Sequence, residues 1–198
     1  MAWLDHILGI RNTANTNLEG VDYEFKVVDS PNELKKIIEE KNKLNNKSRI
    51  VAGYCWNWVS KKNPEKMDIV FPEHSFEAKW NLASDGSLWI LKPESVSEIG
   101  CIHTCQGLEL DYVGVIIGPD LMIQTGEVHT YPELRAKTDK SLHGYKALFK
   151  KNQTEAKRKA DLIIKNTYRT LMTRGQKGCF VFAADTQTNR YLKSLINH

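Results

Sequence analysis

Two segments of the sequence place chemically versatile side chains between apolar runs. Residues 99–117 read IGCIHTCQGLELDYVGVII, and residues 163–182 read IIKNTYRTLMTRGQKGCFVF. In the first segment, Gly107 lies in a polar turn and would let the backbone approach a ligand closely. Glu109 and Asp111 follow, just before an apolar strand. These two carboxylates either face a cleft at the end of that strand or are simply solvated.

Arg174, in the second segment, ends a predicted helix immediately before a strand. Its position alone favours a modest role, in which its charge complements the helix dipole and its side chain bonds the last carbonyl groups. The alternative is an arginine that binds phosphate. Arg169 lies about 140° away around the same helix, so the two guanidinium groups need not share a target.

Trp58 lies in the stretch YCWNWVSKK, close to Trp56 and beside Lys61 and Lys62. Aromatic rings beside cations can stack on bases and hold phosphates, so Trp58 and Lys61 are candidates for nucleic-acid binding. The alternative is packing, with one tryptophan inside the domain and the other covering the edge of a sheet.

The four cysteines predict buried free thiols rather than a metal site. They are irregularly spaced, and three of them lie in apolar runs, which suits a reducing compartment. The stretch Cys101–Cys105 includes His103, but zinc usually takes four ligands as two spaced pairs, and no second pair follows. We therefore expect no metal.

Positive charge is concentrated in residues 135–159, which hold nine basic and two acidic side chains in a chain of net charge +4. Such a segment suits a phosphate backbone, although a solvated, lysine-rich surface has the same composition.

The 198 residues suffice for one ordinary domain, and 41% hydrophobic with 26% charged residues is a globular composition. This composition excludes a disordered tail, a collagen-like repeat and a coiled coil. No run approaches the roughly 18 apolar residues of a membrane span, and the first residues lack the pattern of a signal peptide. We expect a cytoplasmic protein without a membrane partner.

The elements that must position these residues alternate between strand and helix. A strand is predicted over 23–28, followed by a helix to about Leu44 with Ser30 as N-cap and Glu33 reaching back, and then a strand over 49–54. This βαβ order is typical of a parallel sheet. Residues 1–20 predict a lead-in segment with one short amphipathic helix.

The middle of the chain is less regular. Residues 56–76 predict no regular structure, and short strands are expected over 76–80 and 87–90. The apolar stretch 100–104 ends in the polar turn, and 112–117 is nearly continuously apolar, which indicates a central parallel strand. Residues 119–150 predict an irregular basic insertion with a hairpin and a short helix.

Helical periodicity returns from Thr154 to near Arg174, with Gly175 suited to a left-handed C′ position. A last strand over 178–183 and a helix capped by Thr186 follow. The whole order favours an α/β fold, an open three-layer sheet that is mostly parallel, with residues 21–198 forming a single domain.

Taken together, the two segments resemble motifs V and VI of superfamily 1 helicases. The stretch HTCQGLELD, residues 103–111, is similar to the T-x-H-x-x-K/Q-G-L-E-F-D type of motif V, and YRTLMTRG, residues 168–175, is similar to Y-V-A-L-T-R-A of motif VI. The nearest resemblance is to a bacterial family of P-loop proteins described as Schlafen-like DNA/RNA helicase domains. Residues 51–58 and 93–104 also match that family, and the likeness runs from about residue 3 to 191.

This resemblance implies a RecA-like, P-loop NTPase-type domain, the C-terminal motor lobe of an ATP-dependent DNA/RNA helicase or translocase. It implies that Arg174 is an arginine finger directed at the γ-phosphate, and that Gly107 and Glu109 lie near the nucleotide. It places His103 and Thr104 on the nucleic-acid side. The implied partners are single-stranded DNA or RNA and an N-terminal RecA-like lobe, which would bind most of the ATP and Mg²⁺.

Departures from the family motifs set the chain apart from the best-known helicases. Gln106 stands where lysine is usual, Leu110 where phenylalanine is common, and Gly175 where alanine follows the finger. No G-x-x-x-x-G-K-[ST] occurs in the sequence. We therefore expect half an active site, which hydrolyses no ATP alone. The alternatives are a non-catalytic nucleic-acid-binding module that uses residues 135–159, or a nucleotide-sensing regulatory or antiphage lobe without unwinding activity.

Overall fold

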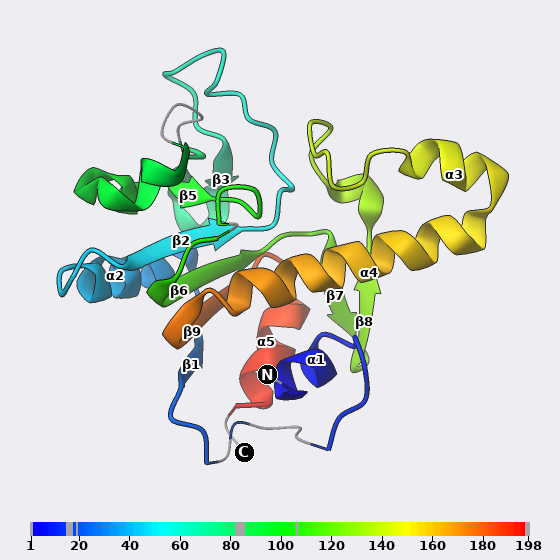
Figure 1. Cartoon of the computed structure of the whole chain (residues 1–198), viewed down its shortest axis with the longest axis horizontal. Helices are drawn as coiled ribbons and strands as arrows, with labels where there is room; N and C mark the ends of the chain where they lie inside the picture. The colour runs from blue at the N-terminus through cyan, green and yellow to red at the C-terminus, as the bar shows by residue number, and fades with distance from the viewer. Residues whose placement is uncertain (1, 15–17, 19, 82–85, 106, 197–198) are drawn as a thin grey trace.

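A sheet of five parallel strands forms the centre of the protein (Figure 1). The computed structural model describes residues 2–14, 18, 20–81, 86–105 and 107–196. Across the sheet, the strands lie in the order β1 (Glu24–Val27), β9 (Gly175–Ala183), β6 (Leu110–Ile117), β2 (Ser48–Ala52) and β5 (Ile99–Gly100). The α/β fold with a parallel sheet is confirmed, and β6 is its central strand as the apolar run predicted.

Helices cover both faces of the sheet, which gives the three layers of a RecA-like fold. One face carries α2 (Pro31–Asn42); the other carries α1 (Ala2–Ile7), α4 (Gln153–Met172) and α5 (Thr186–Ser194). Successive residues of β6 point alternately into the two cores: Val113 and Val115 face α4, whereas Ile116 packs on the α2 side. Burial on both faces explains why residues 113–117 of this strand carry no polar side chain.

The predicted N-cap of α2 is present in a slightly different form. The Ser30 hydroxyl accepts a hydrogen bond from the Glu33 amide at 3.1 Å. The Glu33 carboxylate, however, accepts from the amide of Asp29 at 3.0 Å rather than from Ser30. The cap orients α2 so that Leu34 and Ile38 pack over the glycine at the middle of β6.

Gly114 allows this close approach, and we expect Gly114→Ala to destabilise the fold. A Cβ at this position would lie 2.8 Å from Cγ1 of Ile38 and 3.2 Å from Leu34. The helix must then shift, at a cost of about 1–3 kcal/mol in the free energy of unfolding, which urea titration measures. Adding Ile38→Ala should make the combined loss smaller than the sum of the two single losses; strict additivity would contradict this close packing.

Two predicted strands differ in the structure. Residues 87–90 lie within a 3₁₀ helix, Gly86–Leu91, because the buried guanidinium of Arg49 takes the carbonyl groups of Ile90 and Lys92 at 2.8 and 3.0 Å. These carbonyls are therefore not available for a strand ladder. The apolar stretch 100–104 contributes only its first residue to β5, and the chain turns at Cys101.

Residues 56–76, which were predicted to have no regular structure, contain a short strand. β3 (Ile69–Phe71) pairs antiparallel with β4 (Phe76–Ala78), and the two form a separate hairpin on the α2 face. Three-residue strands carry too few alternating positions to be recognised from pattern alone. Further 3₁₀ turns occupy Pro72–His74, Pro93–Ser97 and Pro132–Leu134.

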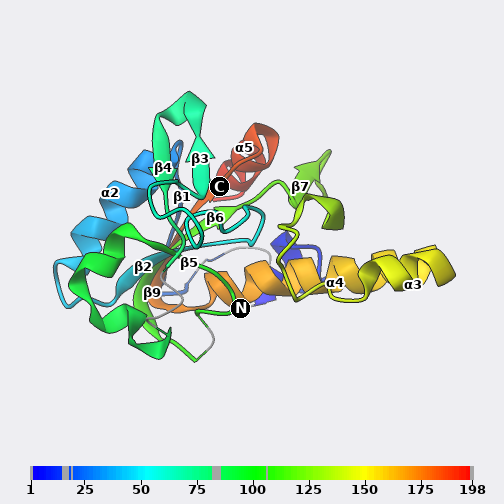
Figure 2. The same cartoon turned by 90° about the horizontal axis from the view of Figure 1, so that it is seen from above.

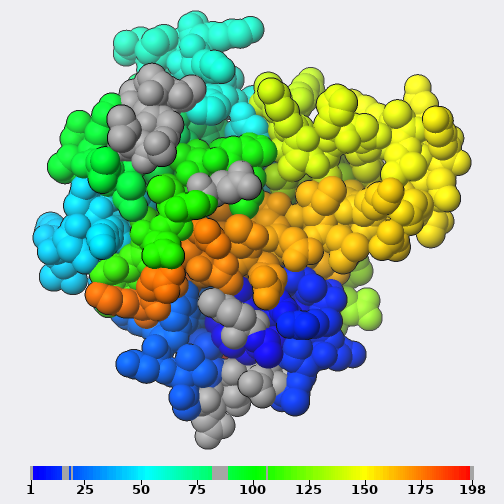
Figure 3. Space-filling view, in the orientation of Figure 1, coloured from blue at the N-terminus to red at the C-terminus, as the bar shows by residue number. Residues whose placement is uncertain are grey.

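The insertion after β6 contains the expected hairpin and short helix. The hairpin consists of β7 (Leu121–Gln124) and β8 (Glu127–Thr130), and the helix is α3 (Tyr145–Lys151). Figures 1 and 2 both show α3 and the first turns of α4 extending away from the sheet as an arm, which also stands out in the space-filling view of Figure 3.

Two details predicted for the helices near the C-terminus need correction: the conformation of Gly175 after α4 and the N-cap of α5. Helix α4 ends at Met172, and Gly175 begins β9 with an ordinary backbone conformation instead of a left-handed one. A Cβ on Gly175 would lie 2.1 Å from the carbonyl oxygen of Gly178, so glycine is needed where β9 bulges. The side chain of Asp185, not Thr186, caps α5 by accepting from the Thr188 amide.

The start of the chain packs into the same core as α4. Trp3, Leu4 and Leu8 are buried there, and the carboxylate of Asp5 binds both Arg169 and Arg11. Desolvation alone would raise the pKa of Asp5, but these two arginines outweigh it and hold the pKa below its usual value. Within the described residues, no helix is both long enough and apolar enough to cross a membrane.

Candidate functional site

A cleft of about 1090 Å³ opens beyond the carboxyl ends of β2 and β5. This is the edge of an open parallel α/β sheet at which ligands usually bind, because the loops that follow the strands converge there. The lining residues come from loops far apart in the sequence: Tyr54, Trp58, Lys61, Lys62, Asn81, Cys101, His103, Thr104, Gly107, Leu108, Lys137, Thr138, Asp139, Lys140 and His143.

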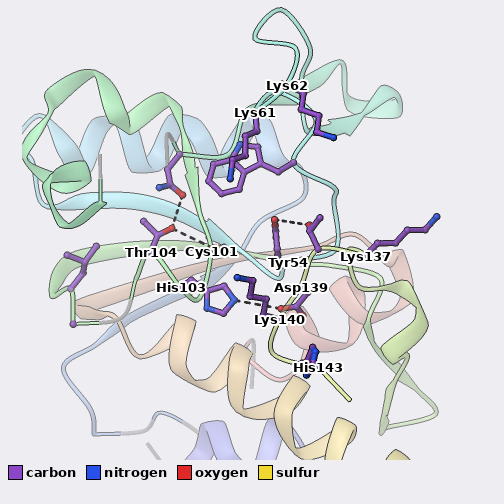
Figure 4. A pocket seen from close by; sticks show the side chains of 15 residues that line it. Tyr54, Lys61, Lys62, Cys101, His103, Thr104, Lys137, Asp139, Lys140 and His143 are labelled. Atoms are coloured by element: carbon purple, nitrogen blue, oxygen red, sulfur yellow. Dashed lines mark hydrogen bonds and ion pairs between the residues drawn. The ribbon is translucent and has the colours of Figure 1, made fainter. Parts of the chain in front are cut away.

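The rim of the cleft is cationic. In Figure 4, Lys61 and Lys62 stand on one side, and Lys140 and His143 lie on the other. Asp139 is the carboxylate of the lining. Burial alone would raise its pKa, but the charge of Arg135 and hydrogen bonds from Ser141 hold the pKa below its usual value. Asp139 is therefore ionised and already paired, and the rim keeps a net positive charge.

The floor of the cleft is aromatic. Tyr54 packs edge-on against the indole of Trp80, with ring centroids 5.2 Å apart, and approaches the imidazole of His103 at 6.5 Å. Trp58 is half-buried, and the ammonium group of Lys61 lies 5.7 Å from its ring centroid, a cation–π distance. An apolar floor beneath a cationic rim can accept a ligand that is flat and apolar on one side and anionic on the other.

Trp56 and Trp58, for which packing and ligand binding were the alternatives, differ in their surroundings. Trp56 packs edge-on against Phe71 at 5.5 Å beside the α2-side core. Trp58 also touches this core, yet part of its ring lines the cleft. Only Trp58 is therefore placed to meet a ligand in the cleft.

His103 and Thr104 lie in the turn that follows β5. The imidazole Nε2 of His103 is 3.7 Å from the Asp139 carboxylate, and half of the side chain is exposed. The Thr104 hydroxyl donates to the side-chain oxygen of Asn81 at 2.7 Å. The four residues predicted for nucleic-acid binding (Trp58, Lys61, His103 and Thr104) thus line one cleft.

Arg174 lies at the opposite, amino-terminal edge of the sheet. Its carbonyl oxygen accepts from the Leu110 amide at 3.0 Å, which puts it beside the end of the 103–111 segment. The half-buried side chain donates through Nε to the Thr170 carbonyl at 3.2 Å, as a helix-terminal arginine does. Among the described residues, its two terminal nitrogens have no hydrogen-bond partner.

The charge of Arg174 acts on Cys105 in the polar turn. Burial raises the pKa of the Cys105 thiol, the nearby Cys101 adds to this, and Arg174 opposes it. Gly107 has a left-handed backbone (φ 82°) with open space around its Cα and lines the cleft. Gln106, which departs from the family motif, lies outside the described residues. The turn therefore runs from the cleft towards the edge that holds Arg174.

The carboxylates at the start of β6 have different surroundings: Glu109 directly precedes the strand, and Asp111 is its second residue. Glu109 is exposed and makes no ion pair or hydrogen bond with the described part of the chain. Asp111 is bound by Lys177 and Asn45, each at 2.7 Å, and the bond from Lys177 lowers its pKa most. Glu109 remains available to a ligand near Arg174, whereas Asp111 belongs to a surface ion pair.

The sequence-based reasoning missed several lining residues and misplaced one. Lys137 and Lys140 stood out only as part of a basic segment, which does not tell which side chains line a cleft, and His143 was not singled out at all. Arg135, counted in the same segment as a phosphate-binding cation, is instead buried with a side chain 2% exposed, because it pairs with Asp120 and Asp139. It cannot touch a phosphate backbone in this fold.

The cysteines are free thiols, and Cys101, Cys105 and Cys179 are buried. Burial raises the pKa of Cys179 as well as that of Cys105, so both stay protonated. No group of three or more His, Cys, Asp or Glu side chains in the described parts of the chain is arranged to hold a metal ion.

Comparisons with known proteins add a family and one relative. A family model described as Schlafen group 3, DNA/RNA helicase domain, matches residues 1–185. An uncharacterised protein of Saccharomyces cerevisiae is 26% identical over 182 residues, which cover 86% of this chain and 37% of the relative. The chain thus spans little more than a third of the length of that relative. No solved structure gives a significant match.

Proposed function

The chain belongs to the Schlafen group 3 DNA/RNA helicase domain family, and we propose on this premise that it is the C-terminal motor lobe of an ATP-dependent helicase or translocase. Membership itself supports a helicase-like function related to nucleic acid. The finer proposal assigns two sites: single-stranded DNA or RNA in the cleft at the carboxyl edge of the sheet, and a nucleotide at the amino edge, next to Arg174.

One observation carries the nucleic-acid site: loops distant in the sequence converge on a cleft with an aromatic floor and lysines at its rim. Bases of an unpaired strand can stack on Trp58 while the phosphates meet Lys61 and Lys140. A duplex keeps its bases stacked on one another, so it would leave this floor uncovered. The arrangement therefore favours a single strand.

The nucleotide site rests on the terminal nitrogens of Arg174, which have no hydrogen-bond partner among the residues that the structure describes. Its Nε is fixed by the Thr170 carbonyl, and the terminal nitrogens remain available to an anion, which fits an arginine finger. ATP with Mg²⁺ would supply the triphosphate, held mainly by an N-terminal RecA-like lobe in a longer protein. Arg174 would stabilise negative charge on the transferring phosphoryl group, and the neighbouring Glu109 is free to contact the nucleotide.

A second candidate function is a non-catalytic nucleic-acid-binding module. The bond from Arg174 to Thr170 favours it, because that bond is sufficient to explain an arginine at a helix end. Under this alternative, nucleic acid still binds in the cleft, but Arg174 has no effect on any activity.

Salt-dependent binding tests the cleft. We expect the chain to bind a fluorescent oligo-dT or oligo-rU in an anisotropy titration, with affinity falling steeply between about 50 and 200 mM salt because lysine contacts release counterions. A duplex of equal length should bind more weakly. Absence of binding, or affinity that does not change with salt, would contradict the proposed function.

Trp58→Ala is expected to weaken single-strand binding while the domain stays folded. Loss of one stacking platform should cost about 1–3 kcal/mol of binding free energy, which the same anisotropy titration measures. Trp56→Ala is the matched control: it removes the ring that packs on Phe71 and should lower the melting temperature more than it lowers the affinity of folded protein. If Trp58→Ala unfolds the domain to the same extent, Trp58 is a core residue.

A further inference from the structure

A cluster of buried polar side chains lies beneath the lysine-bearing wall of the cleft. It consists of Asp120, Arg135, Asp139 and Tyr168, and the side chains of the first three are 0%, 2% and 1% exposed. Buried charges are costly unless they are paired, so a cluster of this kind needs a structural or functional reason. None of the proposed ligand contacts uses it.

Tyr168 belongs to α4, and its side chain extends to the loop that follows β6. Its hydroxyl donates to Asp120 and accepts from the Gly118 amide at 2.8 Å, so it fastens the loop that follows β6. Burial raises its pKa well above the usual value, and the neighbouring Asp120 adds to this, so the hydroxyl stays a proton donor. A Cβ on Gly53 would lie 1.9 Å from this oxygen, which shows how closely the loop after β2 also approaches.

Asp120 links Tyr168 to the residues in the wall of the cleft through Arg135. Its second carboxylate oxygen accepts from Arg135 at 2.8 Å, and Nε of Arg135 donates to Asp139. Asp139 in turn accepts from the amide and hydroxyl of Ser141 at 2.9 and 2.7 Å. Asp139 is thus bonded to Arg135 before it and to Ser141 after it, and these bonds fix the segment that carries Lys137 and Lys140.

We propose that Tyr168 is a positioning residue for the nucleic-acid cleft: through Asp120 and Arg135 it holds Lys137 and Lys140 where they meet phosphates. The inference rests on the proposed function, since it concerns the same cleft. It assigns the tyrosine of the YRTLMTRG segment to the nucleic-acid edge, although Arg174 of that segment lies at the other edge. The competing explanation is that the cluster only stabilises the fold.

Tyr168→Phe separates the two explanations, because it removes the hydroxyl and keeps the ring. If the lysines leave their positions, they neutralise fewer phosphates. The slope of log affinity against log salt should then become shallower by about 0.7 for each phosphate no longer neutralised, or about 1.4 for both lysines. If the variant is merely less stable, a smaller folded fraction binds with an unchanged slope. Anisotropy titrations of the full chain at a series of salt concentrations measure this slope.

Tyr23→Phe is the matched control. It also removes a hydrogen-bonded tyrosine hydroxyl, a partly buried one that donates to the carbonyls of Met172 and Gly175 at 3.2 and 3.3 Å, but at the opposite edge of the sheet. Its salt slope should equal that of the wild type. A shallower slope for Tyr168→Phe alone supports the proposal; an unchanged slope for that variant, or equal changes in both variants, overturns it.

A second variant covers the case in which Tyr168→Phe fails to fold. Asp139→Asn loosens Arg135 and removes a negative charge from the cleft, so charge alone predicts tighter binding and an unchanged or steeper slope. Lost positioning predicts weaker binding with a shallower slope, and tighter binding overturns the proposal. If wild-type protein itself shows no salt-dependent binding, the proposed function fails; if wild type binds as expected and the variants keep its slope, only this inference fails.

Discussion

Arg174→Ala is expected to lower ATP hydrolysis about 10³-fold or more in a protein that contains both motor lobes, the range found when an arginine finger is removed. The reason is electrostatic: the terminal nitrogens of Arg174 carry no bond within the described chain and would be the groups that stabilise charge on the transferring phosphoryl group. Steady-state hydrolysis, measured with and without single-stranded nucleic acid, reports the decrease.

Lys177→Ala is the control for this result. Lys177 is a cation close to the same edge of the sheet, but it pairs with Asp111 on the surface, and its removal should change hydrolysis little. Single-strand affinity should be the same for wild type and Arg174→Ala, because Arg174 does not line the cleft. Hydrolysis by Arg174→Ala within a few-fold of wild type would favour the non-catalytic module.

Reversal of two lysines, Lys137→Glu with Lys140→Glu, is expected to weaken single-strand binding by at least about 100-fold at about 50 mM salt. Two phosphates left without a lysine reduce the salt slope by about 1.4 and the affinity at this salt about 70-fold, and the new carboxylates add repulsion. Both side chains are exposed at the rim, so the fold should not change. Anisotropy titration gives the affinity, and circular dichroism verifies folding.

Lys146→Glu with Lys150→Glu is a matched control with the same change in net charge. Both residues are exposed on α3, in the arm outside the cleft. We expect a much smaller decrease in affinity, mainly from the weaker long-range field. Equal decreases for the two pairs would show that binding follows the charge of the whole 135–159 segment, and that the cleft is not the specific site.

Secondary structure was predictable where a local pattern was long enough to be distinctive. The continuous apolar run of β6 and the helical period of α4 required no tertiary information, because burial on two faces or on one stripe leaves a direct mark on the sequence. The 3₁₀ helix Gly86–Leu91 was not predictable, because the carbonyl of its Ile90 and that of Lys92 just after it are bound by the guanidinium of Arg49 in β2, which lies far earlier in the sequence.

For the candidate site too, the residues could be chosen from the sequence, but their positions in the fold could not. The resemblance of residues 103–111 and 168–175 to helicase motifs V and VI selected His103, Thr104 and Arg174 as candidates. Their separation into two edges of one sheet was not predictable, because it depends on β6 running parallel to β9 and on the turn before β6 crossing the whole sheet.

Periodicity along the chain was therefore enough to predict the parallel α/β architecture, and the resemblance to motifs V and VI was enough to name the candidate residues, since both are properties of neighbours along the chain. Only the folded arrangement decided that Arg135 is buried and that Lys137 and Lys140 line the same cleft as Lys61. The physical reason is that the partners of a charged side chain decide whether it is buried in an ion pair or exposed to a ligand. Asp120, which removes Arg135 from the surface, lies 15 residues away and comes close only when the loop after β6 folds back over the end of the sheet.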